Sequence, residues 1–323
     1  MRRTKSTTLL LILVSAILWF VSPGFSQDFP SKPIIWVNPF SPGGGNGLVA
    51  LAFQKPFEKE LGTRILVENI PGGTTKMGTL YVMNAKLDGY TLILMSDMSW
   101  VGYYYSKTYD TKMWEKLTPI GNLTTEPNGF FEVQVESPYK TWADLVKIAK
   151  ENPGKLTCAS AGAGGMQQLM VDEVSKAAGI EVKFVPFAGA GPSKIALLGG
   201  HVDFRICQVT EAIEMIRAGK TRGLAINTDK RLEALPDVPT FRELGILSLP
   251  SLTRSVWGPP KLPRHIVTLI SRAIEKATKD PDFVKIVETQ FLYKAEYRPP
   301  ERVFEEVNNF DKKYGAKLAE ANK

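Results

Sequence analysis

Residues 39–47 follow an apolar, β-prone run and consist mostly of glycine, a combination through which main-chain amides bind anions. The segment reads PFSPGGGNG and precedes a helix-like run at residues 48–61. Glycine leaves main-chain N–H groups accessible, and a helix that begins there directs the positive end of its dipole at a ligand. The segment lacks the Lys and the Ser or Thr of a P-loop and does not fit the GxGxxG spacing of dinucleotide folds. It therefore predicts a site for a small anion, with a simple strand-to-helix turn as the alternative.

Three further glycine-rich turns follow predicted strands, at residues 71–78, 160–165 and 187–192. Ligands of open α/β sheets bind at the carboxyl ends of the strands, which is where all four turns are placed. Two of the turns belong to the first part of the chain and two to a later part. Because two facing sheets with such turns can hold a ligand between them, we expect a binding cleft.

The elements that position these turns alternate between strand and helix in two series. Apolar periodicity predicts a first series with strands at residues 33–38, 64–68 and 89–95 and helices at residues 48–61 and 74–85. A second series has strands at residues 155–159, 182–186, 202–207 and 221–227 and helices at residues 145–150, 165–178, 193–198 and 211–218. Such alternation implies parallel sheets covered by helices. Ser96 follows the third strand of the first series, and we expect Trp100 just beyond it to form a wall of the pocket.

The pattern as a whole predicts an α/β protein with two lobes and a hinge between them. A length of 323 residues accommodates two domains. The residues after 228 are too few for a third sheet and are expected to return to the first lobe. We assign residues 27–124 and 229–323 to lobe 1 and residues 125–228 to lobe 2.

Residues 1–26 have the features of a secretory signal peptide. Three basic residues precede an apolar core of 13 residues at positions 9–21, and the small residues Gly24 and Ser26 lie three and one positions before Gln27. A retained membrane anchor is the alternative, but the core is shorter than the ~20 residues that span a bilayer. We expect cleavage before Gln27 and a periplasmic location.

The mature chain carries only a mild positive charge, because the formal net charge of +7 includes three basic residues of the leader. Lys and Arg alternate with acidic residues and form no basic stripe, so nucleic acid is not expected as a partner. A weak positive field favours anionic small molecules. We expect a monomer.

Cysteine and histidine patterns give no sign of a metal site or of nucleophilic catalysis. Cys158 and Cys207 lie in predicted buried strands, where free thiols that pack as small apolar groups are favoured over a disulfide. His201 and His265 are distant in sequence, and the chain has no CxxC, HExxH or GxSxG motif. We therefore expect neither a metal nor another cofactor, and a secreted α/β enzyme is the less favoured hypothesis.

A series of motifs appears in order along nearly the whole mature chain. It comprises PFSPGGG at residues 39–45, ENIPG at 68–72, DGYTL at 88–92, NPGKL at 152–156, ASAG at 159–162, VPF at 185–187, LLGGHVD at 197–203, AGK at 218–220 and ALPDVPT at 234–240. Together these motifs closely resemble the Bug-type receptors, the extracytoplasmic solute-binding proteins of tripartite tricarboxylate transporters. The resemblance implies a two-lobed, type II-like periplasmic binding fold that closes on a small organic acid and delivers it to a two-component membrane permease. A sensory receptor for a membrane kinase is the alternative to transport.

The resemblance also implies which residues hold the ligand, because main-chain and hydroxyl groups of three glycine turns grip a carboxylate in the family. Matched position by position, these turns give Phe40, Ser41, Gly43, Gly44, Gly45, Ser160, Ala161, Gly162, Gly165, Phe187, Ala188 and Gly189. Asn46 and Ser96 border the turns and join the candidate set with Trp100. Asp203 matches a recurrent Asp of the family, and a strand-start role is an equal alternative for it.

Several positions depart from the family pattern and bear on the ligand. Asn46 and Gly47 stand where the family usually has Thr or Ser followed by Asp, and Lys76 brings a cation to the second turn. Arg205 stands where an apolar strand residue is usual, and Cys207 where a polar one is common. Lys76 or Arg205 would contact a second carboxylate if its side chain faced the cleft.

The loss of the usual Asp removes a group that orients polar ligands. Phe40, Trp100 and Phe187 offer apolar walls instead. These features favour a less polar or aromatic carboxylate over amino acids and polyacids.

Overall fold

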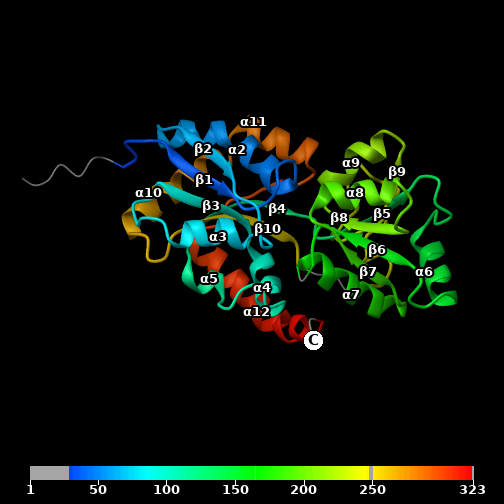
Figure 1. Ribbon diagram of the computed structural model, residues 1–323. Helices are drawn as coiled ribbons and strands as arrows, with labels where there is room; N and C mark the ends of the chain where they lie inside the picture. Colours follow the sequence, from blue (N-terminus) through cyan, green and yellow to red (C-terminus); the bar gives the residue numbers. More distant parts are fainter. Residues whose placement is uncertain (1–28, 164, 247–249, 322–323) are drawn as a thin grey trace, which may run out of the picture.

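The computed structural model describes residues 29–163, 165–246 and 250–321, and the leader predicted at residues 1–26 lies outside the described residues. Two α/β lobes lie side by side, each around its own β-sheet (Figure 1). The structure thus confirms the two-lobed α/β architecture that the alternating pattern predicts.

Lobe 1 is built on a six-stranded mixed sheet with the strand order β11-β4-β10-β3-β1-β2. Its parallel strands are β1 (Ile34–Asn38), β2 (Ile65–Asn69) and β3 (Thr91–Ser96). Antiparallel pairing adds β10 (Leu252–Gly258), β4 (Thr118–Glu126) and β11 (Lys294–Ala295). Because β10 lies between β3 and β4, the C-terminal part of the chain is built into the first sheet.

Helices cover both faces of this sheet because its central strands are apolar on both sides. Trp36 of β1 packs on Phe57 with ring centroids 5.6 Å apart, whereas the next residue, Val37, belongs to the core on the opposite face. The first face carries α2 (Gly45–Leu61), α10 (Arg264–Ala277), α11 (Pro281–Lys285) and the π-helix η1 (Ile286–Gln290). The second face carries α3 (Lys76–Met83), α4 (Asp97–Tyr105), α5 (Met113–Lys116) and α12 (Pro300–Ala321).

Lobe 2 has a five-stranded sheet with the strand order β7-β6-β8-β5-β9. The strands are β5 (Phe130–Gln134), β6 (Thr157–Ser160), β7 (Lys183–Pro186), β8 (Phe204–Cys207) and β9 (Thr221–Ile226). Strands β7, β6 and β8 are parallel, and β5 pairs antiparallel with β8 and β9. The helices of this lobe are α6 (Trp142–Glu151), α7 (Met166–Ala178), α8 (Ala190–Leu198) and α9 (Val209–Arg217).

The chain crosses between the sheets after β4 and again between β9 and β10, and both crossings lie later than the boundaries at 125 and 228 that the sequence suggested. Residues up to Glu126 still pair within the first sheet. Beyond β9, Thr240 forms a bridge with Ile226, and the Phe241 ring packs on Phe131 at 5.3 Å. Residues 229–246 therefore pack on lobe 2, because an aromatic anchor holds them there before the chain returns.

Two further sequence expectations can be compared with the described residues. Both cysteines lie in this part of the chain, and both are buried free thiols, as predicted. Among the described residues, no helix combines the length and apolar character needed to cross a membrane.

Candidate functional site

Helices of both lobes begin just beyond the carboxyl ends of parallel strands. Helices α2 and α4 follow β1 and β3 in lobe 1, and α7, α8 and α9 follow β6, β7 and β8 in lobe 2. Their N-cap residues are Gly44, Ser96, Gly165, Gly189 and Gln208, and none of these side chains caps its helix by a hydrogen bond to a described residue. The helix starts of α2, α7 and α8 also lack an acidic residue in the first turn. Such ends carry partial positive charge and attract anions.

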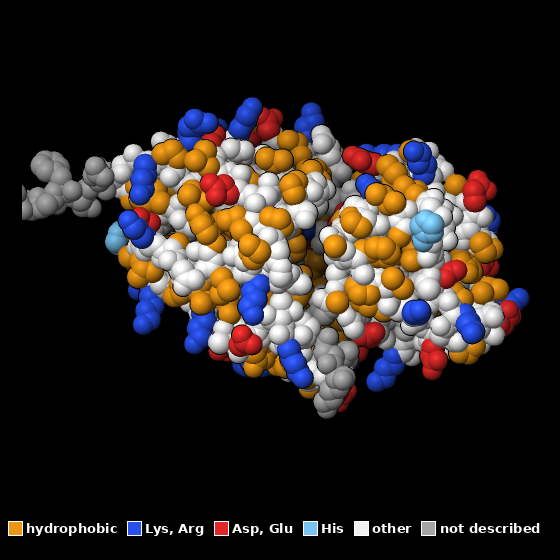
Figure 2. Space-filling view, in the orientation of Figure 1, with side chains coloured by type: hydrophobic (Ala, Val, Ile, Leu, Met, Phe, Trp, Pro, Cys, Tyr) orange, Lys and Arg blue, Asp and Glu red, His pale blue; other side chains and the backbone are white. Residues whose placement is uncertain are grey.

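Contacts between the lobes show that these helix starts face each other. A Cβ placed on Gly45 of lobe 1 would lie 2.9 Å from Gln208 Oε1 of lobe 2. On the other side, a Cβ on Gly165 of lobe 2 would lie 3.2 Å from the Tyr103 ring of lobe 1. Figure 2 shows a hollow between the two lobes. The glycine turns therefore border a cleft between the sheets.

The first turn leaves open space above its backbone. No described atom lies within 4 Å of a Cβ built on Gly43, and only Ser41 O, at 3.8 Å, lies near one built on Gly44. Gly43 has a φ of +80°, which explains the need for glycine there. Phe40 is half-buried beside the turn, and Ser41 is exposed. These residues, which the sequence placed in the site, are available to a ligand.

Asn38 at the end of β1 shapes this turn and was not anticipated from the sequence. Its Nδ2 donates to Phe40 O at 3.2 Å and to Asn69 Oδ1 of β2 at 2.8 Å, while its Oδ1 accepts from the Phe40 N–H at 3.3 Å. An Asn that bonds its own backbone two residues on is a turn former. The signal was therefore present in the sequence, as an Asn at a strand end ahead of a glycine run.

Asn46 points into lobe 1 rather than toward the cleft, which corrects its assignment as a ligand contact. Its Nδ2 donates to Asn38 Oδ1 at 2.8 Å and to Leu94 O at 3.0 Å. Its Oδ1 accepts from Arg254 Nη1 at 2.9 Å, and Arg254 in turn contacts both carboxylate oxygens of Glu126 at 2.6 and 2.7 Å. Asn46 thus supports the turn from beneath.

The turn after β6 is held by its own side chains. Ser160 is fully buried, donates to Gly162 O at 2.7 Å and accepts from the Gly162 N–H at 3.4 Å. The Ala161 N–H donates to Gln167 Oε1 of α7 at 2.9 Å. The Ser160 hydroxyl and the Ala161 amide are therefore occupied within the turn. A Cβ built on Gly162 would have no described atom within 4 Å, so the space above this part of the turn is open.

The turn after β7 is fixed to its neighbour and to the strand beneath it. The Phe187 N–H donates to Ser160 O at 3.0 Å, and Phe187 packs on the small core under α8. Gly189 has a φ of +128°, and no described atom lies within 4 Å of a Cβ there. Ala188 is exposed. Arg205 Nη1 donates to the carbonyl of Ala190, the first residue of α8, at 3.1 Å.

The two cations that the sequence left open, Arg205 and Lys76, are both paired with acids. Arg205 is fully buried, and its guanidinium contacts Glu132 Oε1 at 2.7 Å and Glu211 Oε2 at 3.9 Å. Lys76 pairs with Asp110 at 3.7 Å on the surface. The described residues contain no cluster of three or more His, Cys, Asp or Glu side chains that could hold a metal ion.

Comparison with known proteins assigns a family to this arrangement. The model of the tripartite tricarboxylate transporter family receptor matches residues 49–297. The chain belongs to this receptor family. It is 32% identical over 280 residues to the protein from the TAR-I ttuE-ttuC′ intergenic region of Agrobacterium vitis, which covers 86% of this chain and 80% of the relative.

Solved structures show the same fold. The periplasmic binding protein BugD superposes with a TM-score of 0.81 at 26% identity, over 91% of this receptor and 98% of that chain. MatC from Rhodopseudomonas palustris, determined with bound malate, superposes with a TM-score of 0.77 at 25% identity, over 91% of this receptor and all (100%) of that chain. These similarities confirm the resemblance drawn from the ordered motifs.

Trp100 was expected as a pocket wall, but the receptor places it in the core of lobe 1. It is fully buried, its ring packs edge-on against Trp257 at 5.3 Å, and its Nε1 donates to Thr79 Oγ1 at 3.3 Å. Helix α12 packs over α4 and closes this region. Trp100 therefore stabilises the helix that follows β3 instead of contacting the cleft.

Asp203 takes the strand-start role that was the alternative for it. Its Oδ2 accepts from the Thr157 N–H at 2.8 Å and from Thr157 Oγ1 at 2.7 Å, and its Oδ1 accepts from Tyr139 Oη at 3.2 Å. Thr157 begins β6, whereas the glycine turns follow the opposite ends of the strands. Asp203 lies at the wrong edge of the sheet for a ligand contact.

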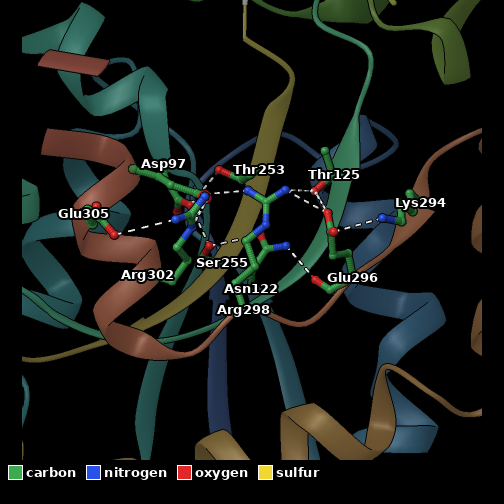
Figure 3. Close-up of polar contacts among 11 residues, drawn as sticks. Asp97, Asn122, Thr125, Thr253, Ser255, Lys294, Glu296, Arg298, Arg302 and Glu305 are labelled. Atoms are coloured by element: carbon green, nitrogen blue, oxygen red, sulfur yellow. Dashed lines mark hydrogen bonds and ion pairs between the residues drawn. The ribbon is translucent and has the colours of Figure 1, made fainter. Parts of the chain in front are cut away.

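Ser96 and Asp97 lie at the start of α4, and Asp97 was not anticipated. Ser96 is buried, and among the described residues its hydroxyl has no hydrogen-bond partner. Asp97 accepts hydrogen bonds from Ser255 Oγ at 2.5 Å and from Thr253 Oγ1 at 3.0 Å (Figure 3). It also accepts one from Trp257 Nε1 at 2.8 Å. Burial outweighs these donors and raises the pKa of Asp97 from 3.8 to about 7. Asp97 thus ties the start of α4 to β10.

A second polar group in the same view joins the C-terminal part of the chain to β4. Arg298 Nη2 donates to Glu296 Oε2 at 2.7 Å and to Thr125 Oγ1 at 2.9 Å (Figure 3). Arg298 also pairs with Glu306 of α12. These bonds hold α12 on the sheet that carries the first turn.

Proposed function

We propose that this receptor binds a small organic carboxylate between its lobes in the periplasm and delivers it to the membrane permease of a tripartite tricarboxylate transporter. One observation carries the proposal. Helices from both lobes begin at glycine N-caps beside open space, at Gly44 of lobe 1 and Gly189 of lobe 2. Partial positive charge from two sides of a cleft matches the negative charge of a carboxylate.

Main-chain amides, rather than a side-chain cation, balance the carboxylate in this proposal. Arg205 and Arg254 are both buried and already paired with glutamates, and Lys76 pairs with Asp110. Glycine turns supply N–H donors without the length and flexibility of a cationic side chain. The malate bound to MatC, a relative of the same fold, also carries carboxylates.

We infer that the preferred ligand is less polar than a tricarboxylate. Phe40 and Phe187 are half-buried beside the turns of lobe 1 and lobe 2. Such rings favour an apolar or aromatic body on the ligand. Trp100 does not contribute, because it is buried in the core.

A thermal-shift screen of aromatic, mono-, di- and tricarboxylic acids tests the proposal. The protein is purified from the periplasm, where its intact mass should correspond to a chain that begins at Gln27. A ligand at a hundredfold its Kd stabilises the folded state by ~2.7 kcal/mol, which raises Tm measurably. We expect a rise with a less polar carboxylate and a smaller one with citrate.

Replacement of Gly162 provides the control within the site. A Cβ at this position meets no described atom within 4 Å, so Gly162→Ala and Gly162→Val should fold like the wild type. Both project into the space assigned to the ligand, and the ligand-induced rise in Tm should fall with Ala and vanish with Val. A full rise in the Val variant, or no rise with any acid in the wild type, would contradict the proposal.

A further inference from the structure

Gln208 of lobe 2 reaches across the hinge into lobe 1. It is the residue between β8 and α9, and its side-chain carbonyl accepts from Arg254 Nη2 at 2.5 Å and from Tyr293 Oη at 2.7 Å. Thr210, in the first turn of α9, lies 2.6 Å from the same Tyr293 oxygen. The start of α9 is therefore bonded to two side chains of the other lobe.

This junction lies directly beneath the first glycine turn. A Cβ on Gly45 would be 2.8 Å from Arg254 Nη2, 2.9 Å from Gln208 Oε1 and 3.0 Å from Tyr293 Oη. Gly45 is the first residue of α2 and is buried. The backbone at the start of α2 thus rests on the three atoms that join the lobes, and a side chain at this position would displace at least one of them.

Tyr293 reaches the junction through an unusual segment of the chain. The π-helix η1 (Ile286–Gln290) precedes it, and Leu292 has a φ of +58°, which is strained for a residue with a Cβ. The Tyr293 N–H donates to Val287 O at 3.0 Å, and the ring is buried. Such strain persists only where surrounding contacts over-determine the conformation, and here it places the Tyr293 hydroxyl on Gln208 and Thr210.

We propose that Gln208 is the positioning residue that sets the angle between the two lobes, through a carbonyl held by Arg254 and Tyr293 beneath Gly45. The hydrogen bonds that the Gln208 carbonyl accepts from Arg254 and Tyr293 fix α9 relative to α2. The turns that follow β1 and β6 therefore keep their positions relative to each other across the cleft. Its effect on ligand capture rests on the proposed function. Its effect on the lobe angle does not, and the test below therefore uses no ligand.

The test measures the distance between the lobes by double electron–electron resonance of nitroxide labels on the mature protein. Leu51 of α2 and Ile195 of α8 are 61% and 69% exposed, so L51C and I195C offer one labelling site on each lobe. The native thiols are buried and will not react with the label. In the Gln208→Leu variant, loss of two hydrogen bonds should change the ratio of lobe arrangements about tenfold, which broadens or shifts the distance distribution.

Two glycine variants make a matched pair on the other side of the junction. Gly45→Ala inserts a methyl group at the three clustered atoms, whereas the Cβ of Gly44→Ala meets only Ser41 O at 3.8 Å. Gly45→Ala should reproduce the broadened distribution, and Gly44→Ala should keep that of the wild type. An unchanged distribution in both Gln208→Leu and Gly45→Ala would overturn the proposal. Equal changes in Gly44→Ala and Gly45→Ala would also overturn it. If Gln208→Leu does not fold, the comparison of Gly44→Ala with Gly45→Ala tests the proposal by itself.

Discussion

Each lobe places an arginine beneath a glycine turn and pairs it with a buried glutamate, but the two lobes balance the charge differently. In lobe 1, Arg254 contacts Glu126 at 2.6 and 2.7 Å and donates to two neutral amides. In lobe 2, Arg205 contacts Glu132 at 2.7 Å and a second acid, Glu211, at 3.9 Å. Lobe 1 has one acid for its arginine, and lobe 2 has two.

Because lobe 2 has one more buried acid, the supports beneath its turns depend on charge differently from the support beneath the turn of lobe 1. Burial raises the pKa of both Glu126 and Glu211, and in each case an arginine opposes the rise. Glu126 uses both oxygens on Arg254, whereas Glu211 Oε2 and Glu132 Oε2 lack a hydrogen-bond partner among the described residues. Buried carboxylates without partners are costly in their charged form. The turn of lobe 1 rests on a neutral network, and the turns of lobe 2 rest on one with excess acid.

The largest effect is expected from breaking the balanced pair of lobe 1. Arg254→Met leaves the buried Glu126 carboxyl without its cation and removes the donors to Asn46 and Gln208. We expect the free energy of unfolding to fall by about 5 kcal/mol, measured by urea denaturation. The double variant Arg254→Met/Glu126→Met should recover most of this loss, because it removes both charges. If the free energy of unfolding falls less in Arg254→Met than in the double variant, Arg254 does not act by balancing the charge of Glu126.

Lobe 1 also contains a buried carboxyl without a cation. This group is Asp97, and its hydrogen-bond donors are all neutral. Its pKa rises from 3.8 to about 7 on folding, so the native state keeps a proton that the unfolded chain has released in this interval. The free energy of unfolding should therefore fall as pH increases from 4 to 8, by roughly 4 kcal/mol from this group.

Urea denaturation of the wild type and Asp97→Asn at pH 5, 6, 7 and 8 measures this dependence. Asn does not titrate, so the variant should show a smaller fall in stability with pH, whatever its absolute stability. The other ionisable groups are common to both proteins and cancel in the difference. Parallel curves would show that Asp97 does not keep its proton at neutral pH.

The strands and turns of both lobes could be predicted from the sequence because their signals are local. An apolar run before a glycine-rich segment and an amphipathic run after it marks a strand, a turn and a helix at each of residues 39–47, 160–165 and 187–192. Glycine at positions 43 and 162 leaves the backbone uncovered by a side chain of its own, and no described atom lies within 4 Å of a Cβ built at either position. The strands, turns and helices that depend on a single segment of chain therefore lie close to where the sequence predicts them.

The supports beneath the turns could not be predicted, because they come from distant parts of the chain. Arg254 reaches Asn46 only because β10 inserts between β3 and β4, and nothing near either residue indicates this pairing. The burial of Trp100 depends on α12, which lies some 200 residues later in the chain and packs on α4. Asp203 entered the candidate set through the family resemblance, whereas its place directly before β8 puts it at the opposite end of the strand from the glycine turns.

The smallest effect, and the sharpest test of the charge difference, is expected from Glu211→Gln. The substitution leaves Arg205 with Glu132 alone, so lobe 2 acquires the one-to-one balance of lobe 1. Because burial raises the pKa of Glu211 above its usual value, the folded protein holds this acid protonated at low pH and carries its buried charge only above the raised pKa. We expect Glu211→Gln to match the wild type at low pH and to exceed its free energy of unfolding by about 1 kcal/mol at pH 8, the scale of one unpartnered buried polar group. Urea denaturation at low pH and at pH 8 measures the difference. If Glu211→Gln is less stable than the wild type at pH 8, the attraction between Arg205 and Glu211 outweighs the cost of burying the charge. The charges beneath the turns would then be balanced in both lobes.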